Sequence, residues 1–238
     1  MDDGILNLLK PSGMTSSDAV GFVKRVMREA GLQNAAMQAR RDTPVKKTKV
    51  GHGGTLDPEA AGVLPILIGG ATKLFDQMTD KRKTYIGELV FGWSTDTQDA
   101  QGETLETSDD IPTEERLLAV LPSFIGEISQ VPPKYSALKV NGSAAYDLAR
   151  SGRDFTLEAR RAMVYGIELL DRVSRDTFLL KVECGRGTYI RTLFHDIGRA
   201  LNCPAHMGFL LRTQAGELTI DEARTPAEIR DEVLGTRY

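Results

Sequence analysis

Residues 163–201, MVYGIELLDRVSRDTFLLKVECGRGTYIRTLFHDIGRAL, contain the pattern that decides the fold class. Residues 163–170 and 177–184 are rich in β-branched, aromatic and other apolar side chains, and they predict two strands joined by the polar segment 171–176. Residues 189–201 predict a helix. Strands dominate the chain without a regular alternation of strand and helix, which favours an α+β domain with a mixed, mostly antiparallel sheet over a doubly wound parallel sheet.

Outside this segment, the N-terminal part of the chain predicts a short strand at residues 4–9, stopped by the turn-forming sequence KPSG. A helix with Ser17 as its cap follows, because apolar residues recur at helical spacing between residues 19 and 30. Residues 33–49 are polar, basic and without periodicity, and they predict a loop. Asp57 and Pro58 predict the cap and first position of another short helix.

Further along the chain, residues 84–91 predict a strand and residues 113–121 a helix. Asn141-Gly142 is typical of the two-residue turn of a hairpin, and residues 146–150 predict a short helix. The sequence after Ala223 is acidic and helix-like but too short to form another domain.

Composition limits the class of protein. The chain has 238 residues, of which 41% are hydrophobic and 26% charged, as expected for one soluble globular domain or one with a small appendage. Its longest apolar stretch, residues 62–70, is far shorter than the roughly 20 residues that a membrane-spanning helix needs. The acidic start, Met1-Asp2-Asp3, does not resemble a secretory signal, so we expect a cytoplasmic protein. The two cysteines are too few for a disulfide scaffold or a four-ligand zinc site.

Charge is unevenly distributed, although the net charge is only −3. Residues 24–49 hold eight basic and two acidic side chains, whereas residues 96–115 hold eight acidic side chains and no lysine or arginine. Such segregation is compatible with a polyanion bound on one face, although solvated helix faces and loops would explain it equally simply.

Several common chemistries are absent from the sequence. The glycine-rich segments 51–55 and 185–188 lack the endings of a P-loop or a dinucleotide fingerprint. The histidines and cysteines do not have metal-ligand spacing, and no Gly-x-Ser-x-Gly motif is present, so we expect no metal, no cofactor and no activated serine.

Two segments combine glycine, charge and aromatic residues in a way that packing does not require: GHGGTLDP at 51–58 and GRGTYIRT at 185–192. Physical chemistry alone leaves ordinary alternatives open. Asp57 is compatible with a helix cap, Arg191 with a surface charge or structural ion pair, and Tyr85 with a half-buried strand residue. His52 in a glycine loop is compatible with purely local hydrogen bonding.

The longer sequence GHGGTLDPEAAGVLP at 51–65 resembles the catalytic motif of the TruB family of pseudouridine synthases. Supporting matches follow in order along residues 4–215. They are KPSGMTS at 10–16, GATK at 70–73, KTY at 83–85, STDT at 94–97, PPKYSALK at 132–139 and GTYIRTL at 187–193. The ordered series is much more specific than any one motif.

The resemblance implies a pseudouridine synthase fold with a central RNA-binding cleft. It implies isomerisation of a uridine in RNA, at position 55 of the TΨC loop of tRNA in bacterial members, without cofactor or metal. It implies that Asp57 is the catalytic carboxylate, that Tyr85 stacks on the flipped base and accepts the proton from ring carbon 5, and that Arg191 keeps Asp57 ionised. It further assigns His52 to the flipped-out RNA segment and Tyr189 and Leu210 to the substrate pocket.

These roles agree with the demands of the reaction. A stacked uridine must be flipped out before it can react, at a cost of a few kcal/mol, and an aromatic side chain can hold it. One carboxylate can serve attack at ring carbon 6, attack at the sugar or elimination to a glycal, so the order of covalent steps stays open. A buried carboxylate needs a cation beside it to stay charged, and a guanidinium can bind it through two hydrogen bonds.

The chain departs from the bacterial pattern in two respects. The stretch between residues 28 and 51 is longer than expected, and we expect its basic side chains to contact tRNA phosphates: Arg40, Arg41, Lys46, Lys47 and Lys49. The sequence contains no match to the C-terminal PUA domain usual in the family, and we expect recognition to rest on the catalytic domain. We therefore expect a catalytic domain over residues 1–223, with a basic loop insertion at 33–49, and a short acidic tail over 224–238.

Three functions compete. The first is an autonomous, monomeric tRNA-modifying enzyme that needs neither a membrane nor an obligatory protein partner. The second is a tRNA-folding chaperone in which binding matters more than turnover. The third is a guide-RNA-dependent pseudouridine synthase, which would normally carry the PUA domain.

Overall fold

The structure is a computed structural model that describes residues 3–37, 48–136, 138–140 and 142–235. The chain divides into two compact units, Met1–Lys83 with Leu211–Tyr238, and Thr84–Leu210. The chain passes from one unit to the other twice, and each time it does so within a strand. The first passage is at the start of β4 (Lys83–Phe91) and the second is within β12 (Ala205–Ala215). In the described part of the chain no helix is long and apolar enough to span a bilayer.

The first unit is organised around the buried strand β3 (Ala61–Ile68). The strand β1 (Gly4–Lys10) pairs antiparallel with β3 along its whole length, with Leu8 opposite Leu64. The other edge of β3 takes the end of β12 in parallel pairing at its first residues and β2 (Val50–His52) in antiparallel pairing at its last. The apolar side chains of β3 are buried, which explains why its sequence is nearly continuous in hydrophobic residues.

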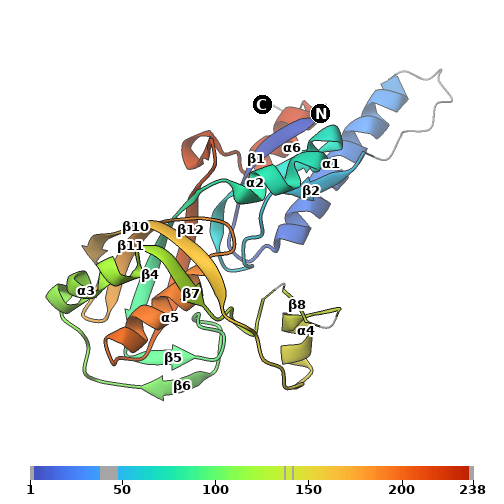
Figure 1. Cartoon of the computed structure of the whole chain (residues 1–238). Coiled ribbons are helices and arrows are strands. Elements are labelled where there is room, and N and C mark those ends of the chain that lie inside the picture. Colours follow the sequence, from blue (N-terminus) through green and yellow to red (C-terminus); the bar gives the residue numbers. More distant parts are fainter. Residues whose placement is uncertain (1–2, 38–47, 137, 141, 236–238) are drawn as a thin grey trace. The chain divides into compact units, whose positions relative to one another are not determined.

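Helices cover this small sheet. They are α1 (Ser16–Met37), the 3-10 turn η1 (Gly69–Leu74), α2 (Phe75–Asp80), η3 (Ile220–Glu222) and α6 (Pro226–Leu234). Figure 1 shows α1 and α6 side by side, and Glu29 of α1 forms an ion pair with Arg230 of α6 at 3.8 Å. The helix α6 begins at a capping box between Thr225 and Glu228 and ends at Gly235 in a left-handed conformation. A short strand, β13 (Leu218–Thr219), pairs with the end of β12.

The second unit contains the sheet β12–β4–β11–β10–β7. The long antiparallel pair β10 (Arg160–Arg172) and β11 (Thr177–Cys184) confirms the two strands predicted from the sequence. The helix α5 (Ile190–Ala200) lies against this sheet (Figure 1), with the Phe194 ring over Gly87, where an added Cβ would lie only 3.0 Å from the ring.

The remaining elements of the second unit are short. They are β5 (Trp93–Thr95), β6 (Thr104–Thr107), α3 (Glu114–Val120), η2 (Leu121–Phe124), β7 (Gly126–Gln130), β8 (Lys139–Val140), β9 (Ser143–Ala144) and α4 (Ala145–Arg150). The pairing of Val140 with Ser143 confirms the predicted hairpin, and α3 and α4 confirm the predicted helices. The sheets are mostly antiparallel, β3 and β12 pair in parallel, and helices flank the strands, so the α+β class is confirmed.

Three local predictions were wrong. The cap of α1 is Thr15 and not Ser17, because the Thr15 hydroxyl accepts from the Asp18 N–H at 2.9 Å while the Asp18 carboxylate accepts from the Thr15 N–H at 3.2 Å. The helix also continues through residue 37, where a loop was expected from residue 33. Residues 57–60 form a single turn and no helix, because the chain enters β3 directly at Ala61.

Candidate active site

The loop of residues 53–60, which carries Asp57, joins β2 to β3 in the first unit. The Gly53 N–H donates to the Pro65 carbonyl at 2.8 Å, and the Ala60 N–H donates to the Asp57 carbonyl at 3.2 Å. Asp57 is half-buried, between the buried Leu56 and the exposed Pro58. Main-chain hydrogen bonds therefore fix both the beginning and the end of the loop, and Asp57 lies between these two ends.

Ser16, at the start of α1, fixes the residue before Asp57. Its buried hydroxyl accepts from the Leu56 N–H and donates to the Leu56 carbonyl, each at 2.9 Å. Both backbone groups of one loop residue are thus satisfied by a single side chain. This contact gives a structural reason for the serine at the end of the KPSGMTS segment.

Lys10, at the end of β1, fixes the residue after Asp57. Its side chain is fully buried, and the ammonium donates to the carbonyls of Pro58 at 3.0 Å, Pro11 at 2.8 Å and Met14 at 2.6 Å. Burial lowers the pKa of Lys10 to about 8, and the negative charges of Glu59 and Asp57 oppose this shift. The Gly13 N–H also donates to the Pro58 carbonyl, at 2.9 Å.

Arg212, on β12, holds the first half of the loop. It is 1% exposed, and its guanidinium donates to the carbonyls of Gly54 at 3.2 Å, Thr55 at 3.4 Å and Val63 at 2.7 Å. Its strand can approach this closely because residue 62 is glycine: at φ 115° an added Cβ would lie 2.2 Å from the Arg212 carbonyl oxygen. Only glycine fits that position.

His52 is the last residue of β2, immediately before the loop. Its ring is half-buried, and its Nδ1 atom is buried without a hydrogen-bond partner among the residues that the structure describes. Burial lowers the pKa of His52, and the positive charge of Arg212 lowers it further. The imidazole is therefore neutral at physiological pH and can both donate and accept a hydrogen bond.

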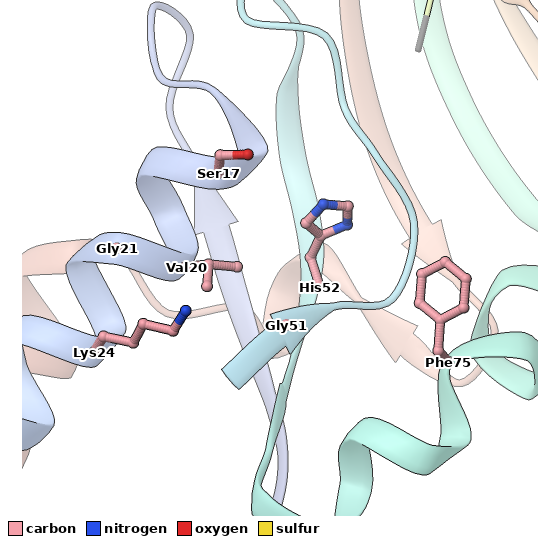
Figure 2. Close-up of a pocket in the computed structure, with 7 residues that line it drawn as sticks. All are labelled: Ser17, Val20, Gly21, Lys24, Gly51, His52 and Phe75. Carbon is pink, nitrogen blue, oxygen red and sulfur yellow. The ribbon is translucent and has the colours of Figure 1, made fainter. Parts of the chain in front are cut away.

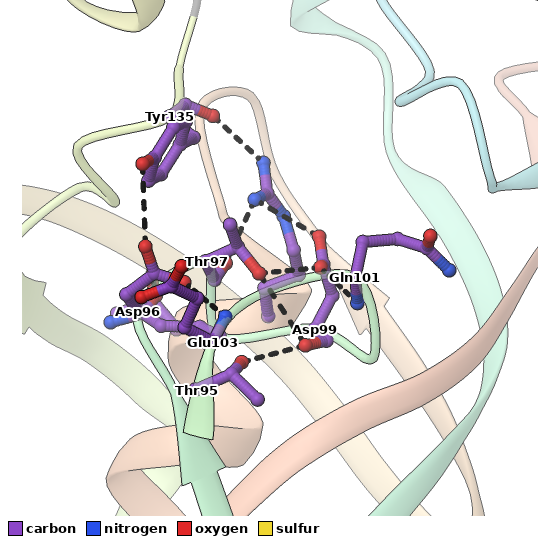
Figure 3. Close-up of polar contacts among 10 residues, drawn as sticks. Thr95, Asp96, Thr97, Asp99, Gln101, Glu103 and Tyr135 are labelled. Atoms are coloured by element: carbon purple, nitrogen blue, oxygen red, sulfur yellow. Dashed lines mark hydrogen bonds and ion pairs between the residues drawn. The ribbon is translucent and has the colours of Figure 1, made fainter. Parts of the chain in front are cut away.

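Arg191 lies in the first turn of α5 in the second unit and is 4% exposed. Its Nη1 donates to the Thr97 carbonyl at 2.9 Å and pairs with Asp99 Oδ2 at 3.3 Å, while Nη2 donates to the Tyr135 carbonyl at 3.2 Å. Figure 3 shows this cluster of polar contacts around Asp99 and Tyr135. The guanidinium is thereby fixed in one orientation.

Asp99 is a residue that the sequence analysis missed. Its Oδ1 accepts from the Thr97 hydroxyl at 2.6 Å and from the Gln101 N–H at 3.0 Å, which leaves Oδ2 for Arg191. The available signal was its place two residues after the STDT segment at 94–97. Among the eight acidic side chains of that region, however, the sequence contains nothing that singles out Asp99.

The other three predicted residues of the second unit lie near α5 or β4. Tyr189 precedes α5, and its backbone exchanges two hydrogen bonds with the Gln130 side chain, at 3.1 and 3.2 Å. Tyr85 and Gly87 lie on the same buried face of β4, because side chains alternate along a strand. An added Cβ at Gly87 would lie 3.1 Å from the Leu210 side chain, so Leu210 packs against this face.

The predicted residues divide between the two units. Asp57 and His52 belong to the first unit, and Tyr85, Tyr189, Arg191 and Leu210 belong to the second. Within the predicted RNA-binding set, Lys49 is exposed immediately before β2. The other four lie outside the described residues: Arg40, Arg41, Lys46 and Lys47.

Within each unit, the segments quoted from the sequence converge. Residues 10–16 and 51–65 meet around Asp57, and residues 94–97, 132–139 and 187–193 meet around Arg191. Segments far apart in the chain are thereby brought together around one candidate catalytic residue in each unit.

Two family profiles match the chain. The profile described as "TruB family pseudouridylate synthase (N terminal domain)" matches residues 41–190, and the one described as "tRNA pseudouridylate synthase B C-terminal domain" matches residues 191–237. The chain belongs to the TruB family of pseudouridylate synthases. The resemblance inferred from the motifs is thereby confirmed.

Curated TruB relatives match nearly the whole chain. The tRNA pseudouridine synthase B of Caldanaerobacter subterraneus subsp. tengcongensis is 42% identical over 96% of this chain and 74% of its own length. The protein of the same name from Clostridioides difficile is 44% identical over 94% of this chain and 69% of its own. Each match covers nearly the whole chain, so the similarity to these relatives extends over both units.

The pseudouridine synthase fold is confirmed by solved structures. A chain from the structure entitled "Crystal Structure of a Cbf5-Nop10-Gar1 Complex" matches with a TM-score of 0.69 and 31% identity over 96% of this chain. A second, from an H/ACA ribonucleoprotein bound to a substrate RNA, matches with a TM-score of 0.66 and 28% identity. The TruB family chain described here spans about half the length of those chains, 54% and 52%.

Proposed function

We propose that this chain isomerises uridine to pseudouridine in tRNA, at position 55 of the TΨC loop, acting as a single protein. The observation that carries the proposal is the convergence of the TruB motif segments on Asp57 in one unit and on Arg191 in the other. The name shared by the curated relatives, tRNA pseudouridine synthase B, supports tRNA as the substrate.

In the proposed reaction, the uridine is flipped out of the RNA stack and its N1–C1′ bond breaks. The base turns and C5 bonds to C1′, after which the proton on C5 is lost and N1 gains a proton, so the product is an isomer of the substrate. Asp57 is the carboxylate that stabilises or attacks the reacting group. Its loop supports this role, because the main chain on both sides of Asp57 is held by buried side chains.

Arg191 and Tyr85 complete the proposed chemistry. A guanidinium held by a carboxylate and two carbonyls presents its charge in a fixed direction, so it can stabilise Asp57 without reorganising during the reaction. Tyr85 provides an aromatic face for the flipped base and a phenolic oxygen for the C5 proton. His52, Tyr189 and Leu210 are proposed to line the RNA-binding surface around the uridine.

The deciding experiment uses purified protein, an unmodified tRNA transcript and no other component, with pseudouridine mapped by chemical probing. We expect product at position 55. Activity only after addition of a guide RNA would instead indicate a guide-dependent enzyme.

A second experiment separates turnover from binding. We expect Asp57→Asn to bind tRNA with unchanged affinity and to lower the single-turnover rate on the order of a thousandfold or more, because the reacting carboxylate is lost. Glu59→Gln is the matched control, since Glu59 is an exposed carboxylate two residues away. An Asp57→Asn enzyme that still forms product would contradict the proposed role.

The basic segment is proposed to contact tRNA phosphates. Neutralising Arg40, Arg41, Lys46, Lys47 and Lys49 together should flatten the dependence of tRNA affinity on salt concentration, because fewer counterions are then released. An unchanged slope in a plot of log affinity against log salt would reject this part of the proposal.

A further inference from the structure

Arg191 of the second unit is enclosed by protein, unlike His52 of the first. His52 lines a cavity of about 430 Å³ between α1, β2 and the first residue of α2, so its ring borders open space (Figure 2). Arg191 is 4% exposed, and the acceptors of its guanidinium are the Thr97 carbonyl, the Asp99 carboxylate and the Tyr135 carbonyl. The groups that hold these acceptors in place therefore decide where the charge of Arg191 points.

Two of the acceptors lie on either side of Gln98, in the loop between β5 and β6. Thr97 comes directly before Gln98 and Asp99 directly after it (Figure 3). The φ torsion of Gln98 describes rotation about its N–Cα bond, so it sets the angle between the peptide that carries the Thr97 carbonyl and the chain leading to Asp99. This φ is 63°. The backbone conformation of one residue thus turns both acceptors toward the same guanidinium nitrogen.

The conformation of Gln98 is unusual for its residue type. Among the residues that the structure describes, Gln98 and Asn202 are the two with a positive φ that are not glycine. Asparagine visits this region several times more often than most residues, whereas glutamine visits it rarely because its Cβ crowds the backbone. A residue stays in such a conformation only where its surroundings enforce it, and residues of this kind cluster at functional sites.

Hydrogen bonds on several sides hold Gln98 in this conformation. Its side-chain Oε1 accepts from the hydroxyl of Thr192 at 2.7 Å, and Thr192 is 2% exposed. Its carbonyl accepts from the Met207 N–H of β12 at 3.0 Å, and its own N–H donates to the Thr95 carbonyl at 3.2 Å. Because Thr192 follows Arg191 directly on α5, the side-chain bond ties the loop to the helical turn that carries the guanidinium.

We propose that Gln98 is a positioning residue, which acts through Arg191 by holding Thr97 and Asp99 in place against it. The inference rests on the proposed function, because it takes Arg191 as the cation that stabilises the reacting carboxylate. Without the bond to Thr192, the loop can shift along α5, and the guanidinium loses its fixed direction although its acceptors are still present. A charge that must reorganise during the reaction stabilises the transition state less than one already in place.

The test begins with substitutions at both ends of the side-chain bond, with single-turnover rate and tRNA affinity measured separately. Gln98→Gly removes the side chain but leaves a positive φ accessible, and Thr192→Val removes the hydroxyl with little change of shape. We expect each variant to lower the rate about tenfold and to leave tRNA affinity unchanged, because Arg191 is displaced while the RNA-binding side chains are intact. Thr192→Ser retains the hydroxyl and should recover most of the rate.

Asn202→Gly is the matched control for Gln98→Gly. Asn202 is the other residue with positive φ, at 56°, and it is exposed just beyond the end of α5. The substitution therefore makes the same kind of backbone change beside the same helix, away from Arg191. We expect the wild-type rate from Asn202→Gly. A Gln98→Gly enzyme that also keeps the wild-type rate would overturn the proposal.

A double-mutant cycle shows whether Gln98 acts through Arg191. Arg191→Lys keeps a positive charge but lacks the planar fork that binds several acceptors in one orientation. Gln98→Gly should therefore lower the rate of the Arg191→Lys enzyme by less than about twofold, since no fixed guanidinium is left to displace. An equal loss in both backgrounds would mean that Gln98 supports the structure in general, and the positioning role would be wrong.

A measurement without RNA separates failure of this inference from failure of the proposed function. Nitrogen NMR of arginine side chains distinguishes the two Nη groups of a guanidinium whose rotation is hindered, and Arg191→Lys assigns the signals. We expect separate Nη signals for Arg191 in the wild type and merged signals in Gln98→Gly and Thr192→Val. Unchanged signals in an enzyme that forms pseudouridine reject the positioning inference only. Signals that merge as expected, in a protein that forms no pseudouridine from intact tRNA, reject the enzymatic proposal only.

Discussion

The two units hold their predicted catalytic residues by opposite means. In the first unit the bonds go to the main chain around Asp57: Ser16 binds Leu56, Lys10 binds Pro58, and Arg212 binds Gly54 and Thr55. In the second unit the side chain of Arg191 itself is held, because its guanidinium donates to the Asp99 carboxylate and to two carbonyls.

This difference follows from what each residue must do. A carboxylate on a short side chain is placed well once its backbone is placed, because only two side-chain torsions are left. Arginine has a long, flexible side chain, so fixing its backbone does not fix its charge. The comparison predicts that changes to the backbone damage the Asp57 side most and that changes to a charge partner damage the Arg191 side most.

Gly62→Ala should have the largest effect on stability. The new Cβ would overlap the Arg212 carbonyl at a φ of 115°, so both the close strand pairing and the position of Arg212 are lost. We expect the free energy of unfolding to fall by about 4 kcal/mol or more. Urea denaturation measures this, with Gly126→Ala as a control that has positive φ but open space around it. Equal losses in the two variants would show that close approach at residue 62 is unimportant.

Asp99→Asn should come second. Arg191, which is 4% exposed, would lose its ion pair with Asp99 while keeping its carbonyl acceptors, which should cost about 3 kcal/mol of stability. The single-turnover rate should fall about a hundredfold, because the guanidinium is no longer fixed. Asp109→Asn, at an exposed position of the same acidic region, should change neither quantity. A fully active Asp99→Asn enzyme would show that the carbonyls alone position Arg191.

Ser16→Ala should have a smaller effect. It leaves the Leu56 N–H and carbonyl without their buried partner, at a cost of about 2 kcal/mol. We expect the rate to fall about tenfold while tRNA affinity stays constant, since the loop is displaced but the RNA-binding side chains are intact. Ser123→Ala removes an exposed serine hydroxyl and serves as the control. Equal single-turnover rates for the two serine variants would show that the Ser16 hydroxyl does not contribute to catalysis.

Lys10 gives the most specific prediction, which concerns pH and no change in the catalytic rate. Its pKa is lowered from 10.5 to about 8, so between these values the unfolded chain retains the lysine proton and the folded chain has released it. Raising the pH through this window therefore favours folding, by at most about 1.4 kcal/mol per pH unit. The difference in unfolding free energy between the wild type and Lys10→Met should rise with pH from about 8 to 10.5. A difference that is flat or falls over that range would contradict the lowered pKa.

Sequence patterns predicted most of the local structure correctly because their causes are local. The strands β1, β4, β10 and β11 and the helices α3 and α5 follow from the spacing of apolar residues and from turn residues beside them. The wrong predictions arise where the same local sequence is compatible with two structures, and the pattern of residues does not choose between them. Serine is the better cap by type, yet Thr15 caps α1, and Asp57-Pro58 suits a turn as well as a helix start.

The TruB resemblance assigns catalytic roles to Asp57, Tyr85 and Arg191, whereas physical chemistry alone leaves ordinary structural alternatives open for each of them. The residues that hold Asp57 and Arg191 could not be found from the sequence. Lys10 and Arg212 are ordinary basic residues in the sequence, and Asp99 lies within a run of acidic ones. Ser16 is an ordinary helix-start residue by sequence, although its hydroxyl binds the main chain of the Asp57 loop.

By itself, then, the sequence determined the α+β class and several of the larger elements, though not the strands β3 and β12, and its TruB motifs supplied the proposed set of reactive side chains. Only the tertiary structure decided which side chains and carbonyls hold the Asp57 loop and the Arg191 guanidinium in place. The contacts that do so join residues 40, 48, 92 and 157 positions apart, for Ser16 with Leu56, Lys10 with Pro58, Arg191 with Asp99, and Arg212 with Thr55. Such pairings depend on strand register and close backbone approach in three dimensions, and local spacing along the chain does not encode either.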